Sequence, residues 1–298
     1  MYFCTYNYKE VEEVGILDDS KTRVISLNEI LINLNYEKVS SMNDFIDKYD
    51  ENTIIQLKRN LKENKFTYLS LDDIKLCAPI PYPKRNIICL GKNYIDHANE
   101  IAGLPGADNE IPRFPIYFSK LAFPAIGQND IILNHKIITD KIDYEVELAI
   151  IIGKDGINIK KENVEEYIFG YTIINDISAR NLQRKHSQWF RGKSLETFCP
   201  MGPYIVCKSQ IPFPVELDIK CSINGELRQN SNTRNLIFDI SYIISDLSKG
   251  MKLKKGDIII TGTPAGVGLG FKPYKMLHSG DVIESYIEKI GTLINYIE

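Results

Sequence analysis

The chain has 298 residues, of which 44% are hydrophobic and 25% are charged, and its formal net charge is −3. This length allows one large hydrophobic core with a smaller companion domain, and the composition is that of an ordinary globular protein. Proteins that bind nucleic acids usually carry a basic face. Because this chain is slightly acidic and has no long block of Lys or Arg, we do not expect it to bind nucleic acid.

The N-terminal segment shows no targeting signal. Charged residues follow the start closely, and no apolar run precedes a small-residue cleavage site. Apolar stretches such as 148–152 are too short to cross a bilayer. The six cysteines include no C-x-x-C pair, which disfavours a zinc ribbon or a thioredoxin-like site, so we expect reduced thiols. The sequence thus predicts a cytoplasmic protein that does not bind membranes.

Residues 1–75 predict a small α+β domain. Apolar and polar residues alternate over 13–17 and 23–27, which is typical of half-buried strands. A helix is predicted over 41–61, where apolar residues recur at helical spacing behind a possible serine N-cap, Ser41.

A connector is predicted at residues 76–84, because three prolines in five positions can continue neither a helix nor a central strand. The remaining residues, 85–298, contain many short apolar runs and few helical patterns. Strands are predicted over 87–90, 116–118, 144–152, 171–174, 217–223, 258–260 and 282–287. A hairpin turn is predicted at Asn224-Gly225 and a helix over 237–247. These elements favour a mixed, β-rich α+β fold with a closed or sandwich-like sheet architecture.

Three acidic residues could form a metal site. Glu145 and Glu147 lie two positions apart on a predicted strand, so their side chains project from the same face. For Glu-x-Glu alone, a strand with one solvated face is the favoured interpretation. A cation, however, would relieve the repulsion between the two glutamates, and a third carboxylate, Asp176, lies at the end of the strand predicted over 171–174. Because all of these ligands are oxygen atoms, the sequence favours Mg²⁺, with Mn²⁺ also possible, over Zn²⁺.

His97 and Glu100 are three positions apart and would share a face of a helix. The carboxylate could then orient the imidazole as a general base, although an isolated H-x-x-E is more often a surface pair. Residues 103–109, rich in Gly, Pro and Asp, indicate a mobile segment of the kind that forms lids. Lys193 stands among apolar and aromatic residues and could be a functional lysine. In isolation, a lysine whose amino group extends to the surface is an equally good interpretation.

A glycine-rich turn at 262–268 follows a predicted strand. It lacks the Gly-Lys-Ser/Thr ending of a P-loop and contains no G-x-G-x-x-G, so nucleotide binding is not predicted. Its backbone N–H groups and the hydroxyl of Thr263 can hold a carboxylate. A tight turn with a purely structural role explains the same pattern.

Taken in order, several segments resemble the fumarylacetoacetate hydrolase family. Gly91-Lys92-Asn93-Tyr94 followed by His97 resembles its G-x-N-Y-x-x-H segment, and residues 143–148 resemble its D-Y-E-x-E-L motif. Residues 175–180 resemble its N-D-x-S-A-R motif. The likeness continues through Gly170-Tyr171-Thr172, Gly192-Lys193-Ser194, 198–203, 256–257, 261–264 and 291–293. It covers residues 76–298, whereas the first 75 residues match only as the small variable N-terminal domain of many members.

The resemblance implies a β-roll catalytic domain over 85–298 and a homodimer. It places a divalent metal on three carboxylates, those of Glu145, Glu147 and Asp176. It also implies that His97 and Glu100 belong to a lid that closes over the substrate. Lys193 would reach the 2-oxo group or an oxyanion. Further residues match positions in the substrate pocket, namely Thr263, Arg180, Gln183 and Lys120.

The chemistry that the resemblance implies is an enolate of a pyruvate-like fragment, stabilised by a Lewis acid. Our first interpretation is hydrolysis of a C–C bond in a 2,4-diketo acid of the acylpyruvate or fumarylpyruvate type, because His97 and Glu100 could activate water. Decarboxylation of an oxaloacetate-type acid, or isomerisation of a hydroxymuconate-type diacid, would use the same site. A metal-binding scaffold without turnover is a further alternative, which the presence of Lys193 and Thr263 disfavours.

Overall fold

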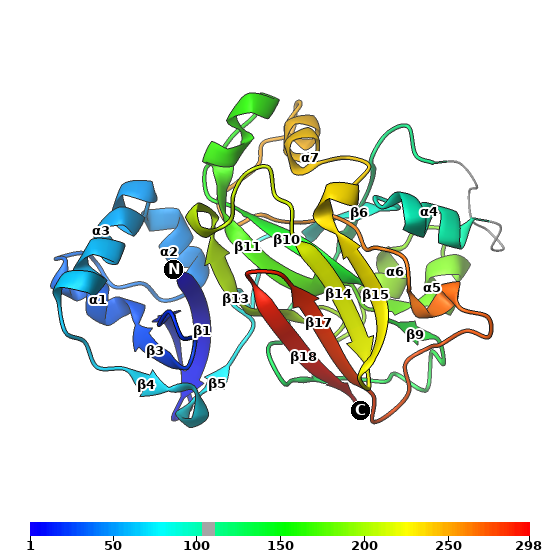
Figure 1. Cartoon of the computed structure of the whole chain (residues 1–298), viewed down its shortest axis with the longest axis horizontal. Coiled ribbons are helices and arrows are strands. Elements are labelled where there is room, and N and C mark those ends of the chain that lie inside the picture. Colours follow the sequence, from blue (N-terminus) through cyan, green and yellow to red (C-terminus); the bar gives the residue numbers. More distant parts are fainter. Residues whose placement is uncertain (103–110) are drawn as a thin grey trace.

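The computed structural model describes residues 1–102 and 111–298 and shows a mixed, β-rich fold with few helices (Figure 1). Residues 103–109, where the sequence predicts a mobile segment, lie outside the described residues. The N-terminal region contains β1 (Tyr2–Tyr8), β2 (Val11–Leu17), β3 (Arg23–Ser26), α1 (Leu27–Asn33), α2 (Met42–Lys48), α3 (Glu51–Glu63), β4 (Leu69–Ser70), the 3-10 helix η1 (Leu71–Asp73) and β5 (Lys75–Leu76).

The helix predicted over 41–61 is two helices in the structure. Ser41 caps α2 as predicted, because its side chain accepts a hydrogen bond from the backbone N–H of Asp44 at 3.2 Å. Asp50 caps α3 in the same way by accepting from the backbone N–H of Thr53 at 3.0 Å. A second N-cap, the acidic Asp50, lies inside the apolar pattern and therefore divides the predicted helix into two.

The remaining elements confirm the predicted series of short strands. They are β6 (Ile87–Gly91), α4 (Ile95–Ile101), β7 (Ile116–Lys120), β8 (Ile131–Ile132), β9 (Ile142–Asp143), β10 (Val146–Ile152), η2 (Lys161–Tyr167), β11 (Ile168–Asn175), β12 (Ser178–Ala179), α5 (Arg180–Lys185), α6 (Phe190–Lys193), β13 (Met201–Cys207), η3 (Lys208–Gln210), β14 (Asp218–Ile223), β15 (Glu226–Asn232), η4 (Thr233–Asn235), α7 (Ile240–Leu247), β16 (Ile258–Ile260), η5 (Gly268–Gly270), β17 (Val282–Ile287) and β18 (Gly291–Ile297). No helix in the described part of the chain is long and apolar enough to cross a membrane.

Two local predictions can be compared directly with these elements. The hairpin turn between β14 and β15 is present, and both Asn224 and Gly225 adopt the positive φ that such a turn requires. The helix predicted over 237–247 begins three residues later, because Asp239 is its N-cap and accepts from the backbone N–H of Tyr242 at 2.7 Å.

Two large sheets organise the fold. The strands of the first run in the order β4-β3-β2-β1-β13-β11-β10-β16-β6-β7, with β5 beside β1, and those of the second in the order β15-β14-β17-β18-β8. Both orders have two ends, so these sheets form a sandwich-like arrangement and not a closed barrel. Because β1 pairs with β13, the N-terminal region and the rest of the chain share one sheet. The boundaries of the two domains stay a prediction.

Strand β10 occupies the middle of the first sheet and is buried on both faces. Leu148 and Ile150 belong to the core shared with the second sheet, whereas Ala149 and Ile151 belong to the core that the N-terminal helices cover. A strand covered on both faces has an apolar sequence throughout. Glu147 breaks this pattern, because it is a carboxylate on the face of Ala149 and Ile151 and is nevertheless buried.

Candidate active site and metal centre

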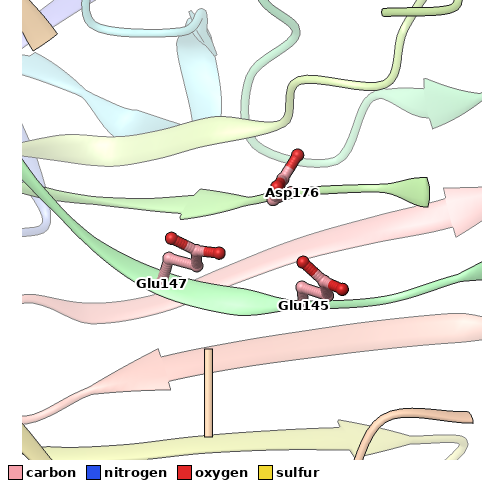
Figure 2. A group of neighbouring side chains, drawn as sticks. All are labelled: Glu145, Glu147 and Asp176. Atoms are coloured by element: carbon pink, nitrogen blue, oxygen red, sulfur yellow. The ribbon is translucent and has the colours of Figure 1, made fainter. Parts of the chain in front are cut away.

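Three carboxylates meet where β10 and β11 pair. Glu145 directly precedes β10, Glu147 is its second residue, and Asp176 directly follows β11. Because these strands are antiparallel neighbours, the start of one lies beside the end of the other. Figure 2 shows Glu145 and Glu147 along one stretch of the chain and Asp176 on the stretch beside it. One oxygen atom from each lies within 4.8 Å of the others, and all three residues are buried. The structure thus brings together the three acids that the sequence predicted as metal ligands.

The charges of the two glutamates in this cluster are compensated to different extents. Burial, together with the charges of Asp176 and Glu145, raises the pKa of Glu147 well above its usual value. Burial also opposes ionisation of Glu145, but the positive charges of Lys193 and Arg180 outweigh it and lower its pKa to about 2. Nearby cations therefore compensate the charge of Glu145, whereas burial and the neighbouring acids oppose ionisation of Glu147.

Lys193 lies among these acids and not at the surface. Its Nζ donates to Oε2 of Glu145 at 2.5 Å and to Oδ2 of Asp176 at 2.6 Å, and its side chain is 2% exposed. Burial alone would lower the pKa of Lys193, but Asp176 and Glu145 outweigh this effect and raise it. The side chain is therefore a buried ammonium that compensates two of the three carboxylates.

The donor set fits a hard divalent cation. All of its atoms are carboxylate oxygens, the ligands that Mg²⁺ and Mn²⁺ prefer. Oδ1 of Asp176 is buried and accepts no hydrogen bond from the described residues. The ammonium of Lys193 already shows that a cation is stable between two of the acids. Glu145, Glu147 and Asp176 could therefore hold a metal ion.

Lys120 lies behind the carboxylates and does not line the cavity described below. It is fully buried, and its Nζ lies 2.8 Å from Oδ1 of Asp176, an ion-pair distance without hydrogen-bond geometry. The same Nζ donates to the backbone carbonyls of Ile177 and Lys193. Its role in substrate binding, which the family resemblance implied, stays a prediction.

Arg180 is held by two carboxylates. Its Nε donates to Oδ2 of Asp143 at 2.7 Å, and its Nη1 lies 2.6 Å from Oε1 of Glu145. Nη1 also donates to Oε1 of Gln183 at 3.1 Å. Burial would lower the pKa of Arg180, but Asp143 and Glu145 outweigh it and raise it. Its Nη2 is buried and has no hydrogen-bond partner among the described residues.

His97 and Glu100 pair on α4 as their spacing predicted. Nδ1 of His97 lies 3.0 Å from Oε2 of Glu100, and the imidazole is buried rather than part of a surface pair. The other carboxylate oxygen, Oε1, accepts from the backbone N–H of Gly266 at 2.8 Å. Because an ionised carboxylate only accepts, Nδ1 carries the proton and Nε2 of a neutral His97 is the basic nitrogen.

Thr263 is fixed by a buried glutamine that the sequence did not single out. Its Oγ1 donates to the carbonyl of Val146 at 3.0 Å and accepts from Nε2 of Gln229 at 2.8 Å. Oε1 of Gln229 in turn accepts from the backbone N–H of Val146 at 3.1 Å. Thr263 is thereby attached to the strand that carries the metal-binding acids.

A cavity of about 450 Å³ joins these groups. Seven of the predicted site residues line it, namely Glu145, Glu147, His97, Arg180, Gln183, Lys193 and Thr263. Asp176, Glu100 and Lys120 lie behind this lining. The sequence did not predict roles for Lys92, Phe118, Arg184 and Trp189, which also line the cavity. The positive charges of Lys92 and Arg184 add to those of Arg180 and Lys193, which favours an anionic ligand.

Comparison with known proteins places this site in a family. The family described as fumarylacetoacetate (FAA) hydrolase C-terminal matches residues 86–298. The oxaloacetate tautomerase YisK of Bacillus subtilis is 51% identical over 240 residues, which cover 80% of this chain and 78% of that protein.

Solved structures agree with this placement over the full length of the chain. A fumarylacetoacetate hydrolase from Exiguobacterium antarcticum is 35% identical with a TM-score of 0.83, and the match covers 100% of this chain and 99% of that one. A 2-hydroxyhepta-2,4-diene-1,7-dioate isomerase from Mycobacterium marinum is 28% identical with a TM-score of 0.70, covering 100% and 98% of the two chains. The chain belongs to the fumarylacetoacetate hydrolase family.

Proposed function

We propose that the protein is a divalent-metal-dependent enzyme that interconverts the keto and enol forms of a small 2-oxo dicarboxylic acid of the oxaloacetate class. The observation that carries this proposal is that one cavity joins the carboxylates of Glu145 and Glu147 to the imidazole of His97. A Lewis-acid site and a base are thus both within reach of one small ligand. The tautomerase from Bacillus subtilis, 51% identical, supports the choice of reaction.

The residues of the cavity suit the two requirements of this reaction. A Mg²⁺ or Mn²⁺ ion held by Glu145, Glu147 and Asp176 would supply a Lewis acid for the oxygen atoms of the substrate. Nε2 of His97 would remove the proton from C3 of the keto form and return it in the reverse direction. Glu100 orients the imidazole by accepting from Nδ1.

Two cationic side chains suit the charges of the substrate. The ammonium of Lys193 would stabilise the negative charge that develops on the 2-oxygen when the C3 proton leaves, and the proton on the enol oxygen would come from solvent. Arg180 lines the cavity and keeps one nitrogen without a hydrogen-bond partner among the described residues, so a substrate carboxylate could use it. A dicarboxylic acid therefore fits the cavity better than a neutral ketone.

Hydrolysis of a C–C bond in an acylpyruvate or fumarylpyruvate is the second candidate. It is favoured by the likeness to the hydrolase from Exiguobacterium antarcticum. The cavity of about 450 Å³ could also accept a 2-oxo acid longer than oxaloacetate. In this reaction His97 would activate water instead of a C–H bond.

One set of assays separates these candidates. Ketonisation of enol-oxaloacetate is followed by the loss of its ultraviolet absorption, with Mg²⁺ or Mn²⁺ and with EDTA, against buffer containing the same metal. Acylpyruvates and fumarylpyruvate are tested in parallel. We expect metal-dependent acceleration of ketonisation. Turnover of diketo acids alone would establish the hydrolase, and no turnover of any substrate would favour the scaffold.

A further inference from the structure

Asp143 is the most completely hydrogen-bonded carboxylate beside the cavity. It is fully buried, and each of its oxygen atoms accepts two hydrogen bonds. Oδ1 accepts from the backbone N–H groups of Tyr144 at 2.9 Å and Gly268 at 2.7 Å. Oδ2 accepts from the backbone N–H of Leu269 at 3.0 Å and from Nε of Arg180 at 2.7 Å. A carboxylate with four such partners has no free acceptor position.

Through Arg180, Asp143 is connected to the metal-binding acids. Nε of Arg180 binds Asp143, and Nη1 of the same guanidinium lies 2.6 Å from Oε1 of Glu145. A guanidinium is planar and rigid, so fixing one edge orients the other. Asp143 thereby orients the charge that faces Glu145.

Asp143 is also connected to the proton-transfer pair, through residues 266–270, which we name the glycine loop. Asp143 binds two backbone N–H groups of this loop, and Gly266 at its start donates to Oε1 of Glu100 at 2.8 Å. At the end of the loop, a Cβ atom on Gly270 would overlap the carboxylate of Glu100. The glycine loop therefore contacts and positions the carboxylate of Glu100, and Oε2 of Glu100 binds Nδ1 of His97.

We propose that Asp143 is a positioning residue that couples the two halves of the active site. It fixes Glu145 through Arg180, and it fixes Glu100, and hence His97, through the glycine loop. The consequence for catalysis rests on the proposed function, but the positions themselves can be measured without turnover. Such coupling requires both ends of the site to respond to one change at Asp143.

The substitution Asp143→Asn tests both ends at once. Asparagine keeps the shape but has one acceptor oxygen in place of two, so two of the four donors lose their acceptor. We expect Mg²⁺ affinity, measured by calorimetry, to fall by about 10–100-fold, as for other residues that orient metal ligands. In protein labelled with ¹⁵N-histidine, we expect the ring signals of His97 to shift. The chain has only four histidines, so His97→Gln identifies these signals.

The control is Asp257→Asn, which alters another buried aspartate that accepts from an arginine, Arg85, and from a backbone N–H, that of Lys254. Asp257 does not line the cavity. This variant should leave Mg²⁺ affinity and the His97 signals unchanged. Either readout remaining at its wild-type value in folded Asp143→Asn would overturn the coupling.

A second variant keeps the proposal testable if Asp143→Asn does not fold. Gly270→Ala displaces only the flexible carboxylate end of Glu100 and leaves Arg180 in place. It should shift the His97 signals while Mg²⁺ affinity stays within about two-fold of wild type, a limit set by ordinary additivity error. Unchanged His97 signals would overturn the role of the glycine loop. If the wild-type protein shows no turnover, the proposed function is rejected. The Mg²⁺ affinity and the His97 signals still test the coupling in that case.

Discussion

The ammonium of Lys193 is bound directly to Glu145, with Nζ 2.5 Å from Oε2. Both groups are buried, so neither is solvated and each depends on the other for compensation. The same carboxylate belongs to the cluster that could hold a metal ion. A metal ion and Lys193 must therefore share the negative charge of Glu145 or compete for it.

This competition predicts the behaviour of Lys193→Met. Without metal, the variant should lose roughly 3–5 kcal/mol of unfolding free energy, because buried acids lose their partner. Addition of Mg²⁺ should then raise its melting temperature more than that of wild type, since the ion no longer competes with the ammonium. Calorimetric melting with Mg²⁺ and with EDTA measures both effects.

Lys254→Met is the matched control, because Lys254 pairs with Asp155 at 2.7 Å but is half exposed. Solvent screens an exposed pair, so this variant should melt close to wild type. A Mg²⁺-induced increase in Lys193→Met that is equal to or smaller than that of wild type would show that the lysine and the ion do not compete.

The neighbouring glutamates should respond differently to the same neutral substitution. Glu145→Gln breaks ion pairs with Lys193 and Arg180 and should cost roughly 3–5 kcal/mol in metal-free protein. The burial and neighbouring charges that raise the pKa of Glu147 oppose its ionisation, so Glu147→Gln should cost less than Glu145→Gln. Both variants should lose Mg²⁺ binding, because each removes a ligand charge. Denaturant unfolding with EDTA, combined with calorimetry, tests this contrast, and equal costs of unfolding would contradict it.

Asp176→Asn completes the test of the metal site. It should abolish metal-dependent activity and weaken Mg²⁺ binding while the protein remains folded, because Asp176 supplies the third oxygen ligand of the cluster. Asp155→Asn, at an exposed carboxylate outside the cavity, is the control. Unchanged Mg²⁺ affinity in Asp176→Asn would exclude this residue as a ligand.

We also expect a homodimer, as the family resemblance implied. Tyr82 and Phe123 are 52% and 67% exposed and pack edge to face with ring centroids 5.1 Å apart, an apolar surface that a second copy could cover. Light scattering at micromolar concentration measures the mass directly. A monomeric mass across that range would reject the dimer.

Local patterns in the sequence were sufficient to predict part of the site. Strand alternation placed Glu145 and Glu147 on one face, and helical spacing paired His97 with Glu100. Both patterns span only a few residues, so they hold in any fold in which the segment forms that strand or helix. The helix cap at Asp50 is also a local pattern. It was not predicted, because the apolar periodicity continues past it from one helix into the next.

Contacts between distant segments could not be predicted in this way. Gln229 binds Val146 across 83 residues, and Asp143 binds Gly268 across 125. No short sequence pattern predicts such pairs, because the order of strands in the sheets and the packing of loops bring them together. The contact between Lys120 and Asp176, 2.8 Å across the ion pair, likewise joins distant segments.

The last prediction separates proton transfer from charge stabilisation. Tautomerisation requires a base at C3, whereas decarboxylation of oxaloacetate requires only that the enolate be stabilised. His97→Ala should therefore lose tautomerase activity by roughly 10²–10⁴-fold, the usual cost of a missing general base. Decarboxylation, if the enzyme supports it, should survive much better, because Lys193 and the carboxylates remain in place. Lys193→Ala should damage both reactions, since both develop charge at the same oxygen.

The experiment measures kcat/KM for both reactions in both variants, with Mg²⁺ saturating. His186→Ala is the control, because His186 is exposed and does not line the cavity. If His97→Ala lowers the two reactions equally, the imidazole contributes to binding or to the shape of the cavity, and its role as the base must be abandoned. If Lys193→Ala spares decarboxylation, the ammonium acts only through the carboxylates that it compensates, and the enolate oxygen is stabilised by another group.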